Sequence, residues 1–116
     1  FIDRTFGAAV QHLAFSCTDI FATAEALAVR GFEALEISPN YYEDLGARFG
    51  LQDAFLARLQ LSKVLYDEDA DGRYFQLYSR RRTSEVFFEI VQRDRDYDGY
   101  GAANAPFRVS AQKRVL

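Results

Sequence analysis

The sequence has 116 residues, of which 49% are hydrophobic and 16% aromatic, and its formal net charge at pH 7 is −3. This length suffices for one small domain with its own core, and the composition is that of a globular chain rather than a disordered one. A weakly acidic chain without a basic tract is not expected to bind nucleic acid or an anionic membrane. No apolar run approaches the roughly 20 residues that span a bilayer, and no signal-peptide pattern opens the chain.

Two further features of the composition indicate the kind of protein. The sequence begins at Phe1 and contains no methionine, so we interpret residues 1–116 as a single module, a fragment of a longer polypeptide. The only cysteine, Cys17, cannot form an internal disulfide. A lone thiol favours a reduced, cytoplasmic protein.

Hydrophobic periodicity predicts a strand followed by a helix in the first third of the chain. Residues 10–17 are apolar and compact, which is typical of a strand. Thr18 or Asp19 is expected to cap a helix that starts at Ile20, and Gly31 is expected to end it. Residues 32–37 alternate again and predict a second strand.

The rest of the chain predicts two short helices, three strands and a terminal helix. The helices are expected between residues 41 and 61, with Gly50 separating them. The strands are expected at residues 63–67, 74–79 and 86–93, and the terminal helix from residue 106 onward. The order β-α-β-(αα)-β-β-β predicts an α+β fold with one sheet of about four strands. Helices on one face leave the other face in need of a partner.

Alternation along the strands brings five candidate residues to common faces. His12 points to one side of the first strand, Gln76 and Tyr78 share a side of the strand at residues 74–79, and Phe87 and Glu89 share a side of the last strand. If these are the same side of one sheet, His12, Gln76 and Glu89 converge inside a half-barrel lined by Tyr78 and Phe87.

A carboxylate in an apolar strand is costly unless it is paired or bound to a metal. Imidazole together with a carboxylate suits a divalent transition-metal ion. The residues alone leave two other interpretations open. His12 can be a satisfied core histidine, and Glu89 can pair with Arg81, Arg82 or Arg93.

Five segments, taken in order from about Gly7 to the end of the chain, resemble 4-hydroxyphenylpyruvate dioxygenases. They are residues 10–15 (VQHLAF) with 18–20 (TDI), residues 39–45 (PNYYEDL), residues 65–67 (LYD) through 76–78 (QLY), residues 87–93 (FFEIVQR), and residues 99–101 (GYG) with Asn104. The first resembles the family segment that carries the second histidine ligand, and the fourth resembles the strand that carries the carboxylate ligand.

The resemblance implies a βαβββ module of the vicinal-oxygen-chelate superfamily, half of a barrel with two inserted short helices. It implies that His12 and Glu89 are ligands of a divalent metal, Fe(II) by resemblance, with Mn, Co, Mg or Zn as alternatives. The family's other histidine ligand comes from an earlier module, and the chain has one histidine, so the triad is not complete within these residues. No catalytic residue beyond the metal ligands is expected.

The resemblance also implies a small-molecule site in which Gln76 lies beside the metal, Tyr78 and Phe87 line the cavity, and Asn104 lies in the loop before the last helix. The family's loop ends in Gly-Asn-Phe, and that Phe closes over the substrate ring. Here residues 103–106 read ANAP, so this half of the aromatic clamp is missing. The variant loop resembles the C-terminal domain of fused bacterial 3-dehydroshikimate dehydratases.

Three functional hypotheses follow from the sequence. The module is the C-terminal part of a 3-dehydroshikimate dehydratase, which forms protocatechuate outside this segment. Alternatively, it is part of a genuine Fe(II)-dependent 4-hydroxyphenylpyruvate dioxygenase acting on a 2-oxo acid, or it is a metal-free assembly module. In each case we expect it to pair with a preceding module of the same chain or with a second copy.

Overall fold

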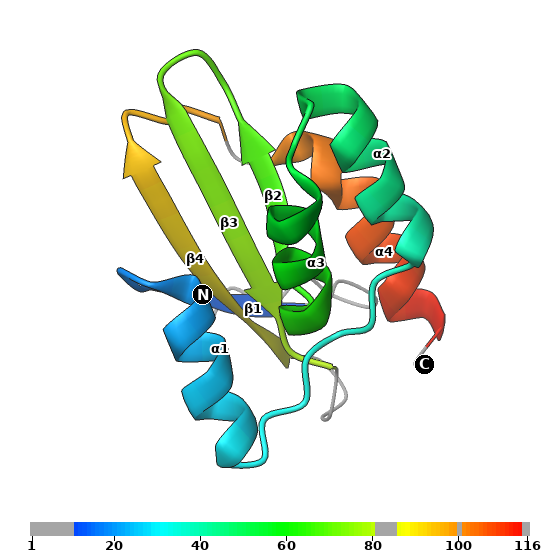
Figure 1. The fold of residues 1–116 in the computed structure, drawn as a ribbon. Helices are drawn as coiled ribbons and strands as arrows, with labels where there is room; N and C mark the ends of the chain where they lie inside the picture. The colour runs from blue at the N-terminus through cyan, green and yellow to red at the C-terminus, as the bar shows by residue number, and fades with distance from the viewer. Residues whose placement is uncertain (1–10, 81–85, 100, 115–116) are drawn as a thin grey trace.

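The protein folds around a four-stranded mixed sheet in the order β1-β4-β3-β2 (Figure 1). The computed structural model describes residues 11–80, 86–99 and 101–114. β1 runs parallel to β4, and the other neighbouring pairs are antiparallel. The strands are β1 (Gln11–Ser16), β2 (Leu65–Glu68), β3 (Gly72–Tyr78) and β4 (Val86–Arg95). The predicted α+β fold is confirmed, with strand ends shifted by one or two residues.

In the described part of the chain four helices accompany the sheet, and local signals explain where they start and stop. The Asp19 carboxylate accepts hydrogen bonds from the backbone N–H groups of Phe21 and Ala22 and caps α1. Gly50 ends α2 in a left-handed conformation, with φ at 64°, and so separates two short helices as expected. The helices are α1 (Ile20–Val29), α2 (Pro39–Phe49), α3 (Asp53–Ser62) and α4 (Ala105–Arg114), with a 3-10 turn η1 (Ala102–Asn104) before the last. No helix in the described ranges is long and apolar enough to cross a membrane.

The prediction of a strand at residues 32–37 is wrong. Only Ala34 forms a β-bridge, to Ser79, supported by hydrogen bonds from Leu35 N–H to the Tyr78 carbonyl and from Arg80 N–H to the Glu33 carbonyl. The antiparallel pairing of β2 occupies the same edge of β3 as far as Gln76, so this segment can reach only the last residues of β3. The chain then turns into α2 at residue 39.

Aromatic side chains join α1 and α3 to one face of the sheet, which we call the α1/α3 face. Phe21 of α1 and Phe55 of α3 both make edge contacts with Phe75 of β3, with ring centroids 6.0 and 6.3 Å apart. Tyr66 of β2 packs edge-on against Phe55 and Phe75. Edge-to-face packing of this kind adds stabilisation beyond that of burial alone.

The hydroxyl of Tyr41 forms hydrogen bonds with backbone groups at the outer edge of β2. β2 is the last strand of the sheet, so its outward backbone groups have no strand partner. The N–H of Tyr66 donates to the Tyr41 hydroxyl at 2.8 Å, and this hydroxyl lies 3.0 Å from the Tyr66 carbonyl oxygen and 2.8 Å from Oδ1 of Asn104. Tyr41 is fully buried. It therefore ties α2 to the edge of the sheet and to η1.

The loop after β4 folds over the opposite side of the sheet, which we call the Glu89 face. The ring of Tyr97 stacks on that of Tyr74, with centroids 4.8 Å apart. The Tyr97 hydroxyl donates to Asp67 and accepts a hydrogen bond from Gly101 N–H. Gly101 has a φ of 67°, and a Cβ there would lie 2.6 Å from Oε1 of Gln76. Only glycine fits this position without displacing Gln76.

Tyr41→Phe is expected to lower the free energy of unfolding by about 1–3 kcal/mol, because it leaves the Tyr66 N–H and Oδ1 of Asn104 without the hydroxyl that each of them contacts. Tyr42→Phe is the matched control, since Tyr42 is also buried but its hydroxyl makes one hydrogen bond, to the Val64 carbonyl. The control is expected to cost about 1 kcal/mol or less. Urea denaturation of each variant measures both values, and equal losses contradict the role given to Tyr41.

Gly101→Ala is expected to destabilise the domain by more than Gly50→Ala does. Both glycines have positive φ, but a Cβ at Gly50 meets nothing within 4 Å. Gly50→Ala therefore reports the backbone cost, about 1–2 kcal/mol, whereas Gly101→Ala adds an overpacking cost of about 1–3 kcal/mol. Thermal or urea unfolding compares the two, and a similar loss in both variants contradicts the close approach of Gly101 to Gln76.

Candidate functional site

The strand register aligns the candidate residues of β3 and β4. Tyr78 pairs with Glu89, and Gln76 pairs with Val91. Paired residues on neighbouring strands point to the same side of a sheet, so these side chains share the Glu89 face. On the other side of β4, the register of β1 pairs His12 with Phe87 and Ala14 with Glu89. The His12 backbone thus lies in β1 two residues from the position opposite Glu89, and its side chain lies outside the part of the chain that the structure describes.

Glu89 is a buried carboxylate held by two neighbours on β3. It is 8% exposed, and its Oε2 accepts hydrogen bonds from Nε2 of Gln76 at 3.1 Å and from the hydroxyl of Tyr78 at 3.3 Å. Nε2 of Gln76 also donates to the Tyr78 hydroxyl. Burial, with the Glu89 charge next in importance, raises the pKa of the Tyr78 phenol far above that of a free phenol. The phenol therefore remains a proton donor to Glu89 at neutral pH.

A chain of buried hydrogen bonds connects this carboxylate to the edge of the sheet. Nδ2 of Asn104 donates to Oε1 of Gln76 at 2.7 Å, and the Tyr41 hydroxyl lies 2.8 Å from Oδ1 of Asn104. The Asn104 N–H donates to the Gly101 carbonyl, which closes η1. The side-chain amides of Gln76 and Asn104 each form hydrogen bonds through both the oxygen and the nitrogen. This fixes the orientation of Gln76, whose NH2 group faces Glu89.

These residue types fit a divalent cation. In metalloproteins, carboxylate ligands are usually themselves hydrogen-bonded by outer-shell groups, as Glu89 is by Gln76 and Tyr78, and imidazole with a carboxylate suits transition metals. Among the described residues, no three His, Cys, Asp or Glu side chains lie close enough to hold a metal ion. A complete ligand set therefore requires groups from outside these residues.

Aromatic rings lie on the same face as the carboxylate, and arginine side chains lie over them. The rings of Tyr78 and Phe87 are tilted against each other, with centroids 5.9 Å apart, and Cζ of Arg108 on α4 lies 5.8 Å from each centroid. Arg93 lies over the Tyr74 ring and donates to the Gly99 carbonyl. Two of the arginines considered as partners of Glu89, Arg81 and Arg82, lie outside the described residues.

The structure thus brings Gln76, Tyr78, Glu89 and Asn104 into one network, with Phe87 beside it. Sequence reasoning missed Tyr41 and Arg108. Tyr41 stands in a helix whose periodicity is explained by its neighbours, so no local signal marks its hydroxyl. Arg108 is followed by Gln112 at helical spacing, and its Nη1 donates to Oε1 of Gln112 at 3.1 Å. That i,i+4 pair was a readable sign that the two side chains share one helix face.

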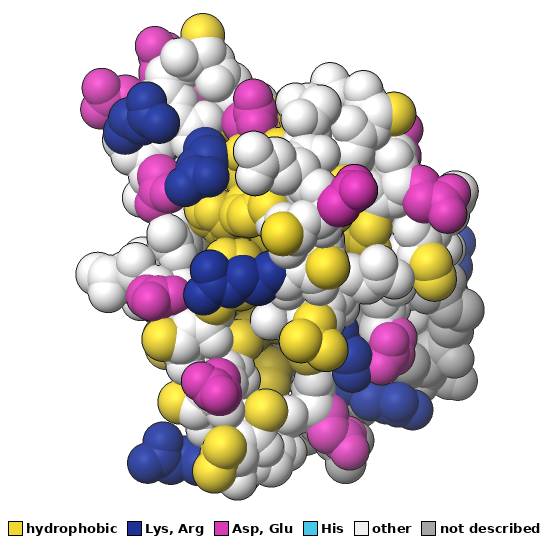
Figure 2. Space-filling model, in the orientation of Figure 1, with side chains coloured by type: hydrophobic (Ala, Val, Ile, Leu, Met, Phe, Trp, Pro, Cys, Tyr) yellow, Lys and Arg dark blue, Asp and Glu magenta, His cyan; other side chains and the backbone are white. Residues whose placement is uncertain are grey.

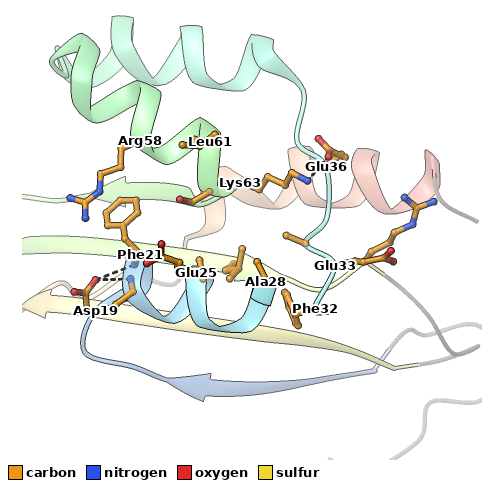
Figure 3. Close-up of a pocket in the computed structure, with 16 residues that line it drawn as sticks. Asp19, Phe21, Glu25, Ala28, Phe32, Glu33, Glu36, Arg58, Leu61 and Lys63 are labelled. Carbon is orange, nitrogen blue, oxygen red and sulfur yellow. Dashed lines mark hydrogen bonds and ion pairs between the residues drawn. The ribbon is translucent and has the colours of Figure 1, made fainter. Parts of the chain in front are cut away.

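A groove of about 740 Å³ lies elsewhere, on the α1/α3 face. Figure 2 shows hydrophobic side chains in a hollow between α1 and α3. In the close-up, Phe21 and Arg58 lie at one end, with the Arg58 guanidinium 4.1 Å from the ring centroid, and Lys63 pairs with Glu36 at the other (Figure 3). The groove includes Leu77 of β3, whose side chain points away from Gln76 and Tyr78. It is therefore distinct from the predicted cavity.

Comparisons with known proteins agree on one relationship. The chain is 47% identical over 110 residues to a 3-dehydroshikimate dehydratase of Pseudomonas aeruginosa, which covers 94% of this chain. It is 36% identical over 110 residues to a 4-hydroxyphenylpyruvate dioxygenase of Caenorhabditis briggsae, covering 90% of this chain. A solved structure described as a xylose isomerase-like TIM barrel/4-hydroxyphenylpyruvate dioxygenase fusion protein superposes with a TM-score of 0.85 at 44% identity over 91% of this chain.

The shares of the relatives that are covered are small. The chain spans 17% of the dehydratase and of the fusion protein, and 28% of the dioxygenase. No protein-family model matches the sequence. The fold, the sequence identity and the nearly complete coverage of this chain nevertheless point the same way: the chain is homologous to the C-terminal part of 3-dehydroshikimate dehydratase and to the C-terminal domains of 4-hydroxyphenylpyruvate dioxygenases.

Proposed function

We propose that this chain is a metal-binding, 4-hydroxyphenylpyruvate-dioxygenase-like domain in the C-terminal part of a 3-dehydroshikimate dehydratase, a lyase that converts 3-dehydroshikimate to protocatechuate. The dehydration takes place outside the segment, and this domain is a module appended to it. The observation that carries the metal assignment is the buried Glu89 carboxylate, held by Gln76 and Tyr78 beside the β1 position of His12.

His12 and Glu89 are the two protein ligands in this proposal. A third ligand comes from a preceding module of the same chain or from a second copy. The residue types suit Fe(II), and Mn, Co, Mg and Zn are alternatives. A divalent ion held by these residues would act as a Lewis acid toward oxygen atoms of a small molecule. Gln76 and Tyr78 hold the Glu89 carboxylate in one orientation, and Tyr78, Phe87 and Asn104 border the ligand.

Two further parts of the proposal concern the context of the domain. A matching solved structure is a fusion protein with a TIM barrel, which supports pairing with a preceding part of the same polypeptide. Cys17 is a free, half-buried thiol, and burial raises its pKa. A poorly reactive lone thiol supports a reduced, cytoplasmic location.

A genuine dioxygenase is the second candidate, and the 36% identity with such an enzyme favours it. The loop before α4 counts against it. Where the family pattern has a Phe after the Asn, this chain has Ala105, the first residue of α4, so one side of the expected aromatic clamp is missing. An aromatic pair contributes about 0.5–1.5 kcal/mol beyond burial, so the ring of hydroxyphenylpyruvate is expected to be held less well.

In the full-length parent protein, Glu89→Gln and His12→Ala are each expected to lower the bound metal by about tenfold or more, since even outer-shell changes at metal sites cost about 10–100-fold in affinity. Glu43→Gln, which removes an exposed carboxylate of α2, is the matched control and is expected to keep the wild-type metal content. Elemental analysis after dialysis against a weak chelator measures the metal. An unchanged content in both site variants contradicts the assignment of His12 and Glu89.

The two enzymatic candidates differ in oxygen consumption. Wild-type full-length protein is expected to consume 3-dehydroshikimate, followed by the absorbance of protocatechuate, without oxygen uptake. With 4-hydroxyphenylpyruvate, an oxygen electrode is expected to show no turnover. Oxygen uptake that is lost in Glu89→Gln supports the dioxygenase candidate instead and overturns the dehydratase assignment if no protocatechuate is formed.

A further inference from the structure

The guanidinium of Arg108 lies over the rings that border the candidate site. Its Cζ is 5.8 Å from the ring centroids of both Tyr78 and Phe87, and the Tyr78 hydroxyl is one of the donors to Glu89. Arginine side chains are usually exposed, but Arg108 is half-buried.

The guanidinium of Arg108 has more N–H donors than it has hydrogen-bond acceptors among the described residues. A guanidinium has five N–H donors, and within the described ranges Arg108 forms one hydrogen bond, to Oε1 of Gln112, and no ion pair. Gln112 is 8% exposed, and its Nε2 is buried with no acceptor among the described residues. The side-chain N–H groups of Arg108 and Gln112, on neighbouring turns of α4, thus have few acceptors among the described residues. Such a surplus of donors suits an anion.

We propose that Arg108 binds a carboxylate group of the ligand that occupies the Glu89 face. The planar fork of a guanidinium matches a carboxylate in a bidentate geometry. The rings of Tyr78 and Phe87 provide apolar contact for a flat ligand. The inference rests on the proposed function, because the metal held by His12 and Glu89 is the second anchor of the ligand.

Gln112 is a positioning residue in this arrangement. Its Oε1 accepts from Nη1 of Arg108 at 3.1 Å, which directs the remaining N–H groups of the guanidinium. Because Arg108 and Gln112 are four residues apart, the pair is built into one face of α4 and moves with that helix.

The test compares two ligands that differ by one carboxylate. Protocatechuate and catechol share the vicinal hydroxyls that can bind a metal, but catechol has no carboxylate. Both are titrated calorimetrically, without oxygen, into the full-length wild-type protein and into Arg108→Gln and Arg108→Lys, with metal content and thermal melting measured for each sample. Arg108→Gln is expected to weaken protocatechuate binding about 10- to 100-fold and catechol binding less than about twofold.

Arg108→Lys keeps the charge but not the fork, so an intermediate loss for protocatechuate is expected. An equal loss for both ligands in Arg108→Gln, or no loss for either, overturns the assignment of Arg108. The metal measurement separates this result from a failure of the proposed function. Wild-type protein without metal contradicts the metal site, whereas the contrast between the two ligands still tests Arg108.

Discussion

The hydrogen-bond chain from Glu89 through Gln76 and Asn104 to Tyr41 is the constraint on which the rest of the structure depends. A buried carboxylate, two amides and a phenol are costly in a core unless each finds a partner, and a partly satisfied network is worse than an apolar core. The four residues of the chain come from four different elements: β4, β3, η1 and α2. The elements must therefore hold their relative positions for any one link to form.

The same chain explains why the loop before α4 lies where it does. Asn104 reaches Gln76 only if η1 comes close to β3, and the glycine at position 101 permits that approach. The ring of Tyr97 stacks on Tyr74 and its hydroxyl donates a hydrogen bond to Asp67, which fixes the start of the loop. The loop and α4 then cover part of the Glu89 face. The candidate site is thus bordered by segments that are also required for stability, which limits how far its residues can change.

Much of this could be predicted from the sequence, for identifiable reasons. Period-2 alternation determines which residues share a face, so Gln76, Tyr78 and Glu89 could be grouped before any pairing was known, and the register of β3 with β4 brings them together. The segment at residues 32–37 also alternates, but strand formation requires a free edge, and β2 had taken most of it. Alternation of apolar and polar residues shows that one side of a segment is buried. It does not show whether another strand already pairs with the edge that the segment would need.

The contacts that remained hidden are those between elements far apart in sequence. Tyr41 reads as one more apolar position of a helix, because nothing nearby reveals that its hydroxyl reaches the backbone of Tyr66, 25 residues away. The orientation of Arg108 toward Tyr78 and Phe87 likewise depends on how α4 is placed against the sheet. Local patterns carry information on faces and ends, whereas such docking depends on the whole core.

The hydroxyls of Tyr41 and Tyr42 have a consequence for how the sheet can grow. An exposed edge strand is a template for another chain, but at β2 the backbone groups of Tyr66 are already occupied by Tyr41, and Tyr42 engages the adjacent Val64 carbonyl. Among the described strands, the other outer strand is β1, where Ala14 and Ser16 are exposed. The backbone groups of Tyr66 at the β2 edge are therefore not available to a strand of another chain.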